Sequence, residues 1–379
     1  MDKGKEIAAL KQRMKEVTPL PQEPQFATAD ETIVRFLKAN DWKYKDAEKA
    51  LLNTVEYRRL TQPLTVDCHH CHARPGFHSM RQVGFDESGR PVMYSSFAQA
   101  SVHKNSVEDL VTHLIYLIEN AKATMENGVT TWVFVIDCTW MTFGACNPKL
   151  GYNVTNILAS HYPERLGLVI CVNINPVFHG VWKALKKLLS PGTVSKVKLV
   201  RSEAKIRQVF STFFSEELAA WLTDELALNR SKPLPKSQLE FWNPPTLEGS
   251  HDPRGSPAYI QRCVQQFKHS DAIFVPGQPK RHCPHPNIID ALQTKVTAVC
   301  LTPSEEAERD QALKDLEVEG AGIAVAMSED EEDEDEDSDE LPTVIRSHPS
   351  GTSQCSDVDG VPDADASKPK SKVKKWISR

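Results

Sequence analysis

The chain has 379 residues, of which 40% are hydrophobic and 25% are charged, and its formal net charge is −6. These values are typical of a protein with one sizeable hydrophobic core in one or two domains. The net charge is misleading, because residues 329–340 ("EDEEDEDEDSDE") hold eleven acidic side chains, and removing these from −6 leaves +5. The mildly basic remainder is compatible with contact to an anionic surface.

Nothing in the sequence predicts export or a membrane span. The N-terminal stretch "MDKGKEIAALKQRMKEV" is charged throughout and lacks the apolar core of a signal peptide. No apolar stretch approaches the length that spans a bilayer. Nine cysteines without an export signal indicate reduced thiols and not a disulfide framework. We therefore expect a cytoplasmic protein.

The N-terminal part predicts a small helical unit over residues 28–62. One helix is expected from Asp30, as its N-cap, to Leu37, because apolar residues recur there at helical spacing. A second helix is expected from Tyr44 to Leu60 on the same grounds. Residues 63–80 contain prolines and a group of cysteines and histidines, and we expect them to form a loop.

Residues 81–230 alternate between strand and helix patterns. Strands are expected at 91–97, 131–137, 167–173 and 194–200. Helices are expected at 106–126 with Ser106 as N-cap, at 150–160, from Pro176 ("PVFHGVWKALKKLL") and at 215–226. Apolar strands that alternate with helices predict an α/β fold with a largely parallel sheet buried between helical layers.

The composition changes after Asn229. Residues 231–300 are rich in proline, and short helices are expected there at 258–268 and 286–300. Residues 301–379 are first acidic and then rich in serine, proline and lysine. That composition predicts a disordered C-terminal tail.

The helix predicted from Pro176 has two different faces. Its apolar stripe consists of Val177, Phe178, Val181, Trp182, Leu185, Leu188 and Leu189, and its opposite face holds Lys183, Lys186 and Lys187. This pattern fits a surface helix packed on the sheet. It also fits a helix that moves between covering a cavity and lying in a membrane interface, where tryptophan and lysine are common. Residue spacing leaves both interpretations open.

Four segments together resemble a known family. They are "GRPVMY" (89–94), "VFVID" (133–137), "HYPERLGLVICVNINPVF" (161–178) and "LLSPGTVSKVKLV" (188–200). Their order and spacing are similar to those of CRAL-TRIO lipid-binding domains of the phosphatidylinositol transfer protein class. The stretch "FLKANDWKYKDAEKAL" (36–51) resembles the helical N-terminal unit of the same proteins. The resemblance covers roughly residues 28–230, with the lipid-binding domain at 81–230.

The resemblance implies a set of headgroup contacts. The family holds the inositol headgroup with a glutamate in "YPER", a lysine in "TVSK" and the neighbouring threonine, which here are Glu164, Lys196 and Thr193. A carboxylate accepts hydrogen bonds from inositol hydroxyls, and an ammonium group and a hydroxyl can hold a phosphodiester. Arg165 is then expected to be a surface or structural partner. The amphipathic helix is implied to be a mobile gate over the lipid, with Val177, Phe178, Val181, Trp182, Leu185 and Leu189 facing it.

This sequence departs from the family pattern at two places. Members that bind inositol lipids carry basic residues at the positions of Asn40 and Asp41, so one phosphate contact is missing here unless Lys38 replaces it. Members that also bind phosphatidylcholine carry small hydroxyl residues on the second strand, where this chain has Trp132 and Phe134. These bulky side chains on the pocket strand argue against phosphatidylcholine as a second ligand.

The implied function is binding of phosphatidylinositol in an apolar pocket and its transfer or presentation between membranes. Its implied partners are the phospholipid and, transiently, a membrane surface, with no nucleic acid and no stable oligomer, so we expect a monomer. Three alternatives remain: a carrier of another hydrophobic ligand, an α/β hydrolase-like enzyme with an unrecognised active site, and a scaffold that acts through its acidic tail.

Evidence for an enzyme is weak in this sequence. It contains no G-x-S-x-G, no P-loop and no G-x-G-x-x-G after a strand. Asp137, followed by Cys138, ends a strand, which is where α/β active sites cluster. No base is identifiable beside it, so we expect Asp137 to anchor the turn and we expect no catalytic residue.

The segment "CHHCH" (68–72) has two remaining interpretations. Covalent haem attachment to C-x-x-C-H requires export, which nothing here predicts. Cys68 and Cys71 have the spacing of a zinc knuckle, and the histidines nearby are His69, His70, His72 and His78. A second C-x-x-C is absent, and Cys283 lies far away in the sequence. A structural zinc or unliganded loop thiols are both consistent with this pattern, and no other cofactor is expected.

Overall fold

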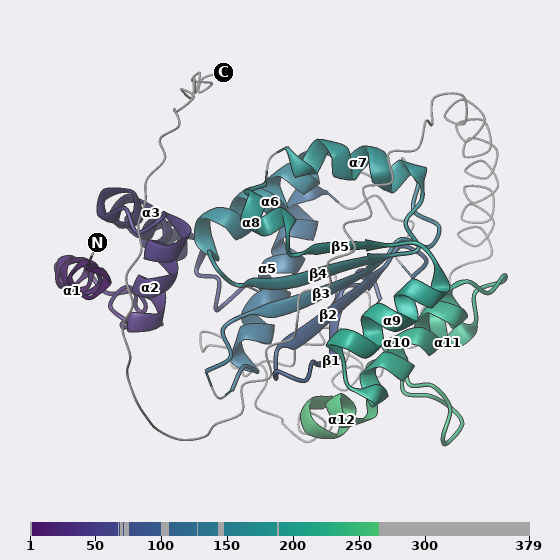
Figure 1. Cartoon of the computed structure of the whole chain (residues 1–379). Helices are drawn as coiled ribbons and strands as arrows, with labels where there is room; N and C mark the ends of the chain where they lie inside the picture. The colour runs from purple at the N-terminus through teal and green to yellow at the C-terminus, as the bar shows by residue number, and fades with distance from the viewer. Residues whose placement is uncertain are drawn as a thin grey trace, which may run out of the picture. The chain divides into compact units, whose positions relative to one another are not determined.

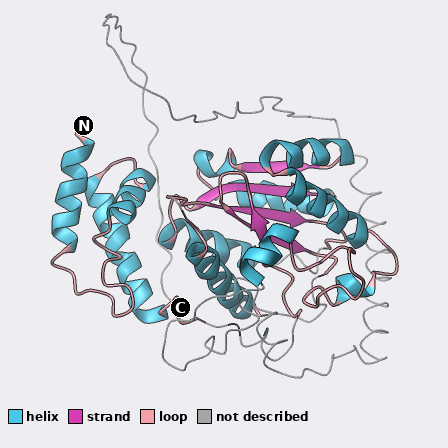
Figure 2. Cartoon of the chain, turned by 90° about the horizontal axis from the view of Figure 1, so that it is seen from below, coloured by secondary structure: helices cyan, strands magenta, loops and turns pink. Residues whose placement is uncertain are grey.

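A five-stranded sheet with helices on both faces is the central element of the computed structural model (Figures 1 and 2). The structure describes residues 2–66, 68, 71, 76–99, 106–126, 128–142, 148–187 and 189–264. The predicted helix at 286–300 and the predicted tail at 301–379 lie outside these residues. Within the described part of the chain, no helix is long and apolar enough to cross a membrane.

Three N-terminal helices share one hydrophobic core. They are α1 (Lys3–Met14), α2 (Asp30–Ala39) and α3 (Tyr44–Thr61). The positions of α2 and α3 agree with the sequence pattern. Helix α1 lies outside the predicted elements, because charged residues dominate its sequence, although Leu10 and Met14 are buried against the other two helices.

The predicted N-cap of α2 is wrong. Ala29 occupies the cap position and makes no side-chain cap hydrogen bond, so Asp30 is the first helical residue. The Asp30 carboxylate instead accepts a hydrogen bond from Nζ of Lys11 over 2.6 Å. Asp30 therefore connects α1 to α2, and its charge also suits the positive end of the helix dipole.

The strands lie in the sheet in their sequence order, β1-β2-β3-β4-β5. Their bounds are β1 (Arg81–Phe85), β2 (Pro91–Ser96), β3 (Trp132–Asp137), β4 (Leu166–Val172) and β5 (Val197–Val200). Strand β1 is antiparallel to β2, whereas β2 to β5 are parallel neighbours. The fold is therefore α/β with a mostly parallel sheet, as the sequence pattern predicts.

Two differences from the predicted strands have local causes. Strand β1 was not predicted because it contains Arg81, a charged residue, which is fully buried and pairs with Glu225 over 2.8 Å. Strand β5 begins three residues later than expected, since the short helix α8 (Pro191–Val194) occupies the start of that segment. Ser190 caps α8 by accepting a hydrogen bond from the Thr193 amide.

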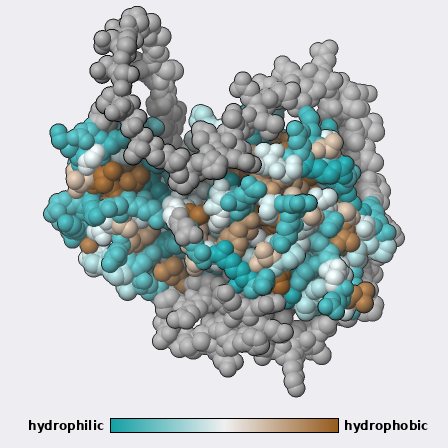
Figure 3. Space-filling view, turned by 60° about the horizontal axis from the view of Figure 1, so that its bottom comes forward, coloured by the Kyte–Doolittle hydropathy of each residue, from teal (hydrophilic) through white to brown (hydrophobic). Residues whose placement is uncertain are grey.

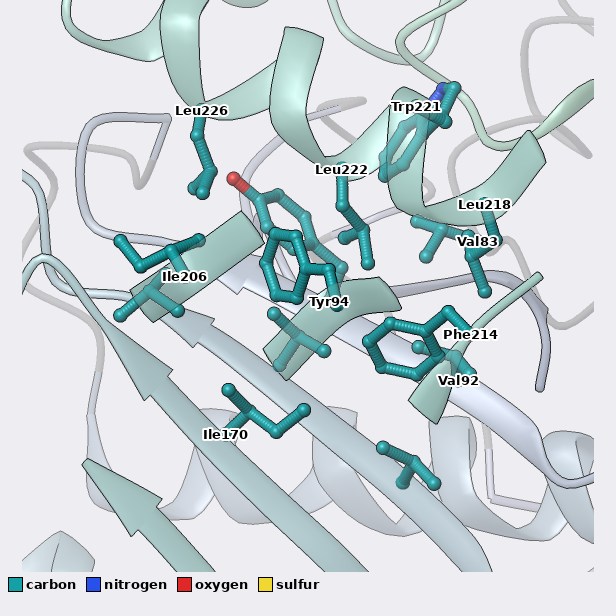
Figure 4. Packing of buried hydrophobic residues seen from close by; sticks show 14 of the residues in the cluster. Val83, Val92, Tyr94, Ile170, Ile206, Phe214, Leu218, Trp221, Leu222 and Leu226 are labelled. Atoms are coloured by element: carbon teal, nitrogen blue, oxygen red, sulfur yellow. The ribbon is translucent and has the colours of Figure 1, made fainter. Parts of the chain in front are cut away.

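One face of the sheet packs against α9 (Glu203–Phe213) and α10 (Glu216–Asn229). Figure 4 shows Tyr94 and Ile170 of the strands meeting Ile206, Phe214 and Leu222 of this layer. Helix α10 corresponds to the helix predicted at 215–226, whereas α9 was not predicted. The side chains of this interface are almost fully buried, so this layer is a closed core.

The opposite face packs against a second layer of helices. These are α5 (Val107–Ala123), α6 (Pro148–His161) and α7 (Pro176–Lys186). Ser106 caps α5 in a capping box with Asp109, as the sequence predicts. Helix α7 leaves the carboxyl end of β4, and the chain then returns through α8 to the start of β5, as a parallel crossover requires (Figure 1).

Part of the proline-rich extension packs on the lipid-binding fold expected at 81–230. It contains α11 (Lys236–Leu239), α12 (Pro257–Tyr259) and a π-helical turn, η2 (Ile260–Val264). The backbone amide of Ser256 donates to the Val83 carbonyl of β1 over 2.9 Å. Gly255 is required next to this contact, because a Cβ there would lie 2.8 Å from the same carbonyl oxygen. The extension therefore covers the free edge of β1 as far as residue 264.

Candidate functional site

The two faces of the sheet differ in how well they are covered. Val135, Ile170 and Val200 point towards α9 and α10 and are buried. Ile136, Val169 and Leu199 lie on the opposite face of the same three strands, because side chains alternate along a strand, and they are only partly buried. We call Ile136, Val169 and Leu199 the half-covered face. Trp132, Phe134 and Cys171 on the same side of these strands are buried, so the incomplete burial is confined to the half-covered face as defined here.

Helix α7 lies over the half-covered face. Asn175 caps it by accepting a hydrogen bond from the Phe178 amide over 3.0 Å, and Pro176 occupies its first turn. Phe178 is the most buried side chain of the helix and packs on Cys138, Met141, Cys171 and Ile174. The other described residues of the predicted apolar stripe, Val177, Val181, Trp182, Leu185 and Leu189, are only partly buried, and Leu188 lies outside the described residues. The predicted helix is too long at its end, because α7 stops at Lys186 and Leu189 follows it.

Lysines occupy the outer face of α7, as predicted. Lys183, Lys186 and Lys187 are all exposed. Helix α7 therefore presents an apolar side to the sheet and a basic side to solvent. Its single well-buried residue, Phe178, lies at its N-terminal end, so most of the helix is held by few contacts.

Helix α6 lies beside α7 and is also loosely packed. Val154, Ile157 and Leu158 are partly buried against the sheet layer, whereas the side chain of Tyr152 is 55% exposed. Gly151 is where the two helices approach, since a Cβ at this position would lie 3.1 Å from a methyl carbon of Leu185. Together α6 and α7 form an incompletely closed apolar layer over the half-covered face.

The residues assigned to the headgroup lie at one edge of the sheet. Glu164 is exposed and precedes β4, while Lys196 is partly buried and immediately precedes β5. Because β4 and β5 are parallel neighbours, these two positions share the amino-terminal edge of the sheet. Thr193 lies in α8 at the same edge, with its hydroxyl 3.0 Å from that of Ser190. The three predicted residues therefore come from two separate segments at this end of the sheet, and the pairing of Val169 with Val197 places Lys196 level with Leu168.

The neighbours of Glu164 hold its segment against the N-terminal helices. Arg165 is buried, donates to the Thr130 carbonyl over 2.8 Å and pairs with Glu31 of α2 over 2.7 Å. Arg35 donates to the Pro163 carbonyl over 3.3 Å. Arg165 is thus a structural residue, and Glu164, with a φ of 58°, is turned outwards between these two anchors.

Trp132 and Phe134 are buried under α5 and α6. Both belong to a cluster with Leu117, Ile118 and Tyr162, and the rings of Trp132 and Tyr162 lie 6.1 Å apart. Among the described residues, Trp132 Nε1 has no hydrogen-bond acceptor, although it is buried. Buried indole N–H groups usually have a partner, so Trp132 is an exception to that rule within this buried cluster.

The structure explains the role of Asp137, the carboxylate at the end of β3, and the state of Cys171 on β4. One carboxylate oxygen of Asp137 accepts hydrogen bonds from the Thr139 amide and hydroxyl and from Asn173, and its other oxygen accepts from Ser96. Asp137 thus anchors the turn after β3. Cys171 lies beneath α7, and burial raises the pKa of its thiol to about 12, so this part of the face stays uncharged.

The cysteines of the predicted knuckle belong to a larger group. Cys68, Cys71, His78 and His113 are all buried, and their ligand atoms lie within 4.8 Å of one another. The hydrogen bond to Cys71 and those to the two imidazoles lower the pKa of the Cys68 thiol well below its usual range. His113 was missed because it lies on α5, far from the cysteines in the sequence. The available signal was a histidine within the apolar pattern of that helix.

On the molecular face shown in Figure 3, apolar residues form small patches between hydrophilic ones. The large hydrophobic residues that are most exposed in the described part of the chain, Leu60, Tyr152 and Leu247, come from separate segments. The half-covered face is therefore a better candidate for an apolar ligand than these scattered residues.

Family models define the class of protein to which this fold and site belong. The chain matches the CRAL/TRIO N-terminal domain over residues 6–53 and the CRAL/TRIO domain over residues 80–219. These two segments therefore belong to the CRAL/TRIO family.

Two proteins that are 29% identical to this chain have names that refer to the CRAL-TRIO domain or to phosphatidylinositol transfer. The chain is 29% identical over 170 residues to a CRAL-TRIO domain-containing protein of Schizosaccharomyces pombe, which covers 44% of this chain and 17% of the relative. It is 29% identical over 198 residues to the phosphatidylinositol transfer protein PDR17 of Saccharomyces cerevisiae, covering 47% of this chain and 54% of PDR17. The chain thus spans about half of PDR17 and much less of the first relative. Among solved structures it is similar to the crystal structure of Sfh5, with a TM-score of 0.45, 20% identity, and coverage of 54% of this chain and 82% of that chain.

Proposed function

We propose that this chain binds a phospholipid between the half-covered face and α7 and transfers or presents it between membranes. The observation that carries the proposal is the contrast between the two faces of the sheet. Burying the apolar area of Ile136, Val169 and Leu199 would be favourable at about 25 cal/mol per Å², and an acyl chain supplies matching apolar surface. Membership of the CRAL/TRIO family and the name of PDR17 support the same function.

The side chains of Glu164, Lys196 and Thr193 at the amino-terminal edge of the sheet favour phosphatidylinositol as the bound lipid. Inositol carries hydroxyl donors for the Glu164 carboxylate, and its phosphodiester is a suitable acceptor for Lys196 and Thr193. Lys38 is exposed at the end of α2 and is a candidate for a further phosphate contact, since Asn40 donates to the Phe36 carbonyl and caps that helix. Trp132 and Phe134 provide no hydroxyl group for a choline lipid.

The proposed gate is α7. Its apolar stripe is only partly buried, its outer face is basic, and Trp182 lies on the apolar side. Such a helix could leave the sheet and enter an anionic membrane interface at a modest cost in lost contacts. The hinge would be at its N-terminal end, where Asn175 and Phe178 fix it to the end of β4.

The proposal makes this chain a carrier in preference to an enzyme. A carrier returns its ligand unchanged, which separates it from a hydrolase. The test is to purify the full chain under native conditions, identify bound lipid by mass spectrometry, and measure transfer of labelled phosphatidylinositol between vesicles. We expect phosphatidylinositol to copurify and to be transferred without chemical change. Absence of both bound lipid and transfer would contradict the proposal, and release of a lipid product would favour the enzyme.

A labelled phosphatidylcholine serves as the matched control ligand in the same assay. We expect much slower transfer of this lipid, because the edge residues suit an inositol headgroup. Equal transfer of both lipids would leave a phospholipid carrier but remove the inositol specificity. If neither lipid is transferred and the mass spectrum shows another bound hydrophobic molecule, the chain carries a different apolar ligand.

A further inference from the structure

The buried group of Cys68, Cys71, His78 and His113 has the distances of a metal site. His78 Nδ1 lies 3.5 Å from Cys68 Sγ and 3.4 Å from Cys71 Sγ, and His113 Nδ1 lies 3.5 Å from Cys71 Sγ. In a tetrahedral site with Zn–S bonds of about 2.3 Å and Zn–N bonds of about 2.0–2.1 Å, sulfur and nitrogen are separated by about 3.5 Å. The three separations agree with that geometry. We propose that these four side chains bind one structural zinc ion.

The surroundings of His113 prepare it to be a ligand. Its Nε2 lies 3.0 Å from the carbonyl oxygen of Met80, an acceptor, so Nε2 carries the proton. In a neutral imidazole the other nitrogen, Nδ1, then has a free lone pair, and Nδ1 is the atom that faces Cys71. A ligand histidine whose second nitrogen donates to a backbone carbonyl is the usual arrangement around zinc.

The four ligand atoms and the burial of their residues favour zinc over other metals, and a structural role over a catalytic one. Two thiolates and two imidazoles in a tetrahedron are typical of structural zinc, and the four protein ligands leave no position open for water or substrate. All four residues are buried, and Val66 and Tyr116 form an apolar boundary beside the cysteines. A two-iron cluster with this donor set would place the cysteines and the histidines on different irons. The short sulfur–nitrogen separations do not allow that division.

The zinc would join three parts of the fold. Cys68 and Cys71 follow α3, His78 precedes β1, and His113 lies on α5. The ion would therefore close the connection between the N-terminal helical unit and the sheet and fix it to the helix that covers the sheet. The unfolded chain does not hold these four ligands together, so zinc would bind mainly to the folded state. The free energy of zinc binding therefore adds to the stability of the folded chain.

The experiment uses the full chain, produced in zinc-containing medium and purified without chelators. We expect one zinc ion per chain by elemental analysis, and X-ray absorption at the zinc edge should show two sulfur and two nitrogen ligands. A chain without zinc, which also fails to bind added Zn²⁺ in equilibrium dialysis, would overturn the proposal. Iron in place of zinc, or an all-nitrogen and oxygen ligand shell, would overturn it as well.

Variants separate this site from other cysteines and histidines of the chain. Cys71→Ser should lose zinc, since Cys71 Sγ contacts both histidines, and His113→Asn should weaken its retention at least tenfold. Cys283→Ser and His179→Asn are the matched controls and should keep one zinc ion. If Cys71→Ser does not fold, the wild-type chain with Co²⁺ in place of zinc tests the ligand set by its absorption spectrum. Two thiolate ligands in a tetrahedral site should give thiolate-to-cobalt charge-transfer bands and strong d–d bands. Retention of zinc by folded Cys71→Ser and His113→Asn chains would contradict the assignment.

The proposal is independent of the lipid. Removal of zinc with a strong chelator should lower the melting temperature of the full chain, and added Zn²⁺ should restore it. A chain that carries zinc but binds no lipid would leave the zinc site intact and remove only the proposed function. A chain that transfers lipid but contains no zinc would support the proposed function and overturn the zinc site.

Discussion

Arg58 of α3 donates from Nη1 to Oε1 of Glu119 on α5 over 2.8 Å, and both side chains are almost completely buried. Lys122 lies 2.6 Å from the other carboxylate oxygen, and the Tyr162 hydroxyl donates to Oε1 over 2.9 Å. Burial raises the pKa of the Glu119 carboxyl, but Lys122 and Arg58 outweigh it and hold that pKa at about 2. An ionised network therefore connects the N-terminal helices to the CRAL/TRIO domain.

Removal of the charge of Glu119 is expected to destabilise the chain strongly. Glu119→Gln leaves Arg58 buried without its main countercharge, which typically costs about 3–5 kcal/mol. Glu203→Gln is the control, because its pair with Arg207 is exposed and contributes about 1 kcal/mol or less. Urea unfolding followed by circular dichroism measures both changes, and equal losses for the two variants would contradict a buried network.

The stability of the chain should fall between about pH 6.5 and pH 4 because of His161. This residue ends α6, stacks on Tyr57 of α3 at 3.8 Å and lies 3.1 Å from the Thr54 hydroxyl. Burial, and then the charge of Arg58, lower its pKa from 6.5 to about 4. The unfolded state therefore binds more protons than the folded state in this interval, so stability is complete above 6.5 and is lost as pH falls towards 4.

The measurement for His161 is the free energy of unfolding across this pH interval. His161→Gln should lower the stability and reduce its pH dependence, whereas His179→Gln on the exposed side of α7 should leave the pH dependence unchanged. The same slope in wild type and His161→Gln would show that another group titrates.

Substitution of the edge residues should weaken transfer of the inositol lipid. Lys196→Ala would remove the proposed charge-assisted hydrogen bond to the lipid phosphate, worth about 1.5–3 kcal/mol, which is about tenfold or more in affinity. Glu164→Ala should have an effect in the same direction through the inositol hydroxyls. The control is Lys236→Ala on α11, a helix that lies beside α9 and α10 in Figure 1, and the Lys236 side chain is 82% exposed. Folded Lys196→Ala and Glu164→Ala chains that transfer phosphatidylinositol like wild type would disprove the headgroup assignment.

A charge on the apolar side of α7 should slow lipid uptake from vesicles. Trp182→Asp is the informative variant, because Trp182 is only partly buried and a carboxylate resists entering the membrane interface. Phe178→Asp should also reduce stability, since Phe178 packs in the core and fixes the helix. Lys183→Gln on the outer face is the control for helix formation. Unchanged uptake by folded Trp182→Asp would mean that α7 is a fixed part of the scaffold.

Truncation after residue 300 is expected to leave lipid transfer intact. The acidic block at 329–340 repels an anionic membrane, so its removal should lengthen the time that the chain stays on such vesicles. Vesicle sedimentation and the transfer assay measure the two effects. A truncated chain that folds but no longer transfers lipid would support the scaffold alternative, in which the tail carries the function.

The sequence by itself determined the elements with a strong periodicity. Helices α2, α3, α5, α6 and α7 and strands β2, β3 and β4 agree with the sequence predictions within a few residues. The helices have apolar residues at helical spacing, and the strands are short, mostly apolar runs. The family followed from four segments in register, and the family models confirm it. Strand β1 could not be predicted in this way, since it begins with a charged residue. Arg81 is buried because it pairs with Glu225 of α10 and donates to the carbonyls of Ser79 and Pro253.

The tertiary structure decided which residues meet. Asp30 has the pattern of an N-cap, yet Lys11 of α1 draws its carboxylate into a contact between helices. The C-x-x-C spacing is that of a zinc knuckle and His78 lies nearby in the sequence, while His113 is the fourth member of the group only because α5 packs beside them. The alternation of β3 and β4 predicted two apolar faces but not their difference in burial. That difference depends on how closely α6 and α7 pack on one face and α9 and α10 on the other, and packing between layers is a property of the folded chain as a whole.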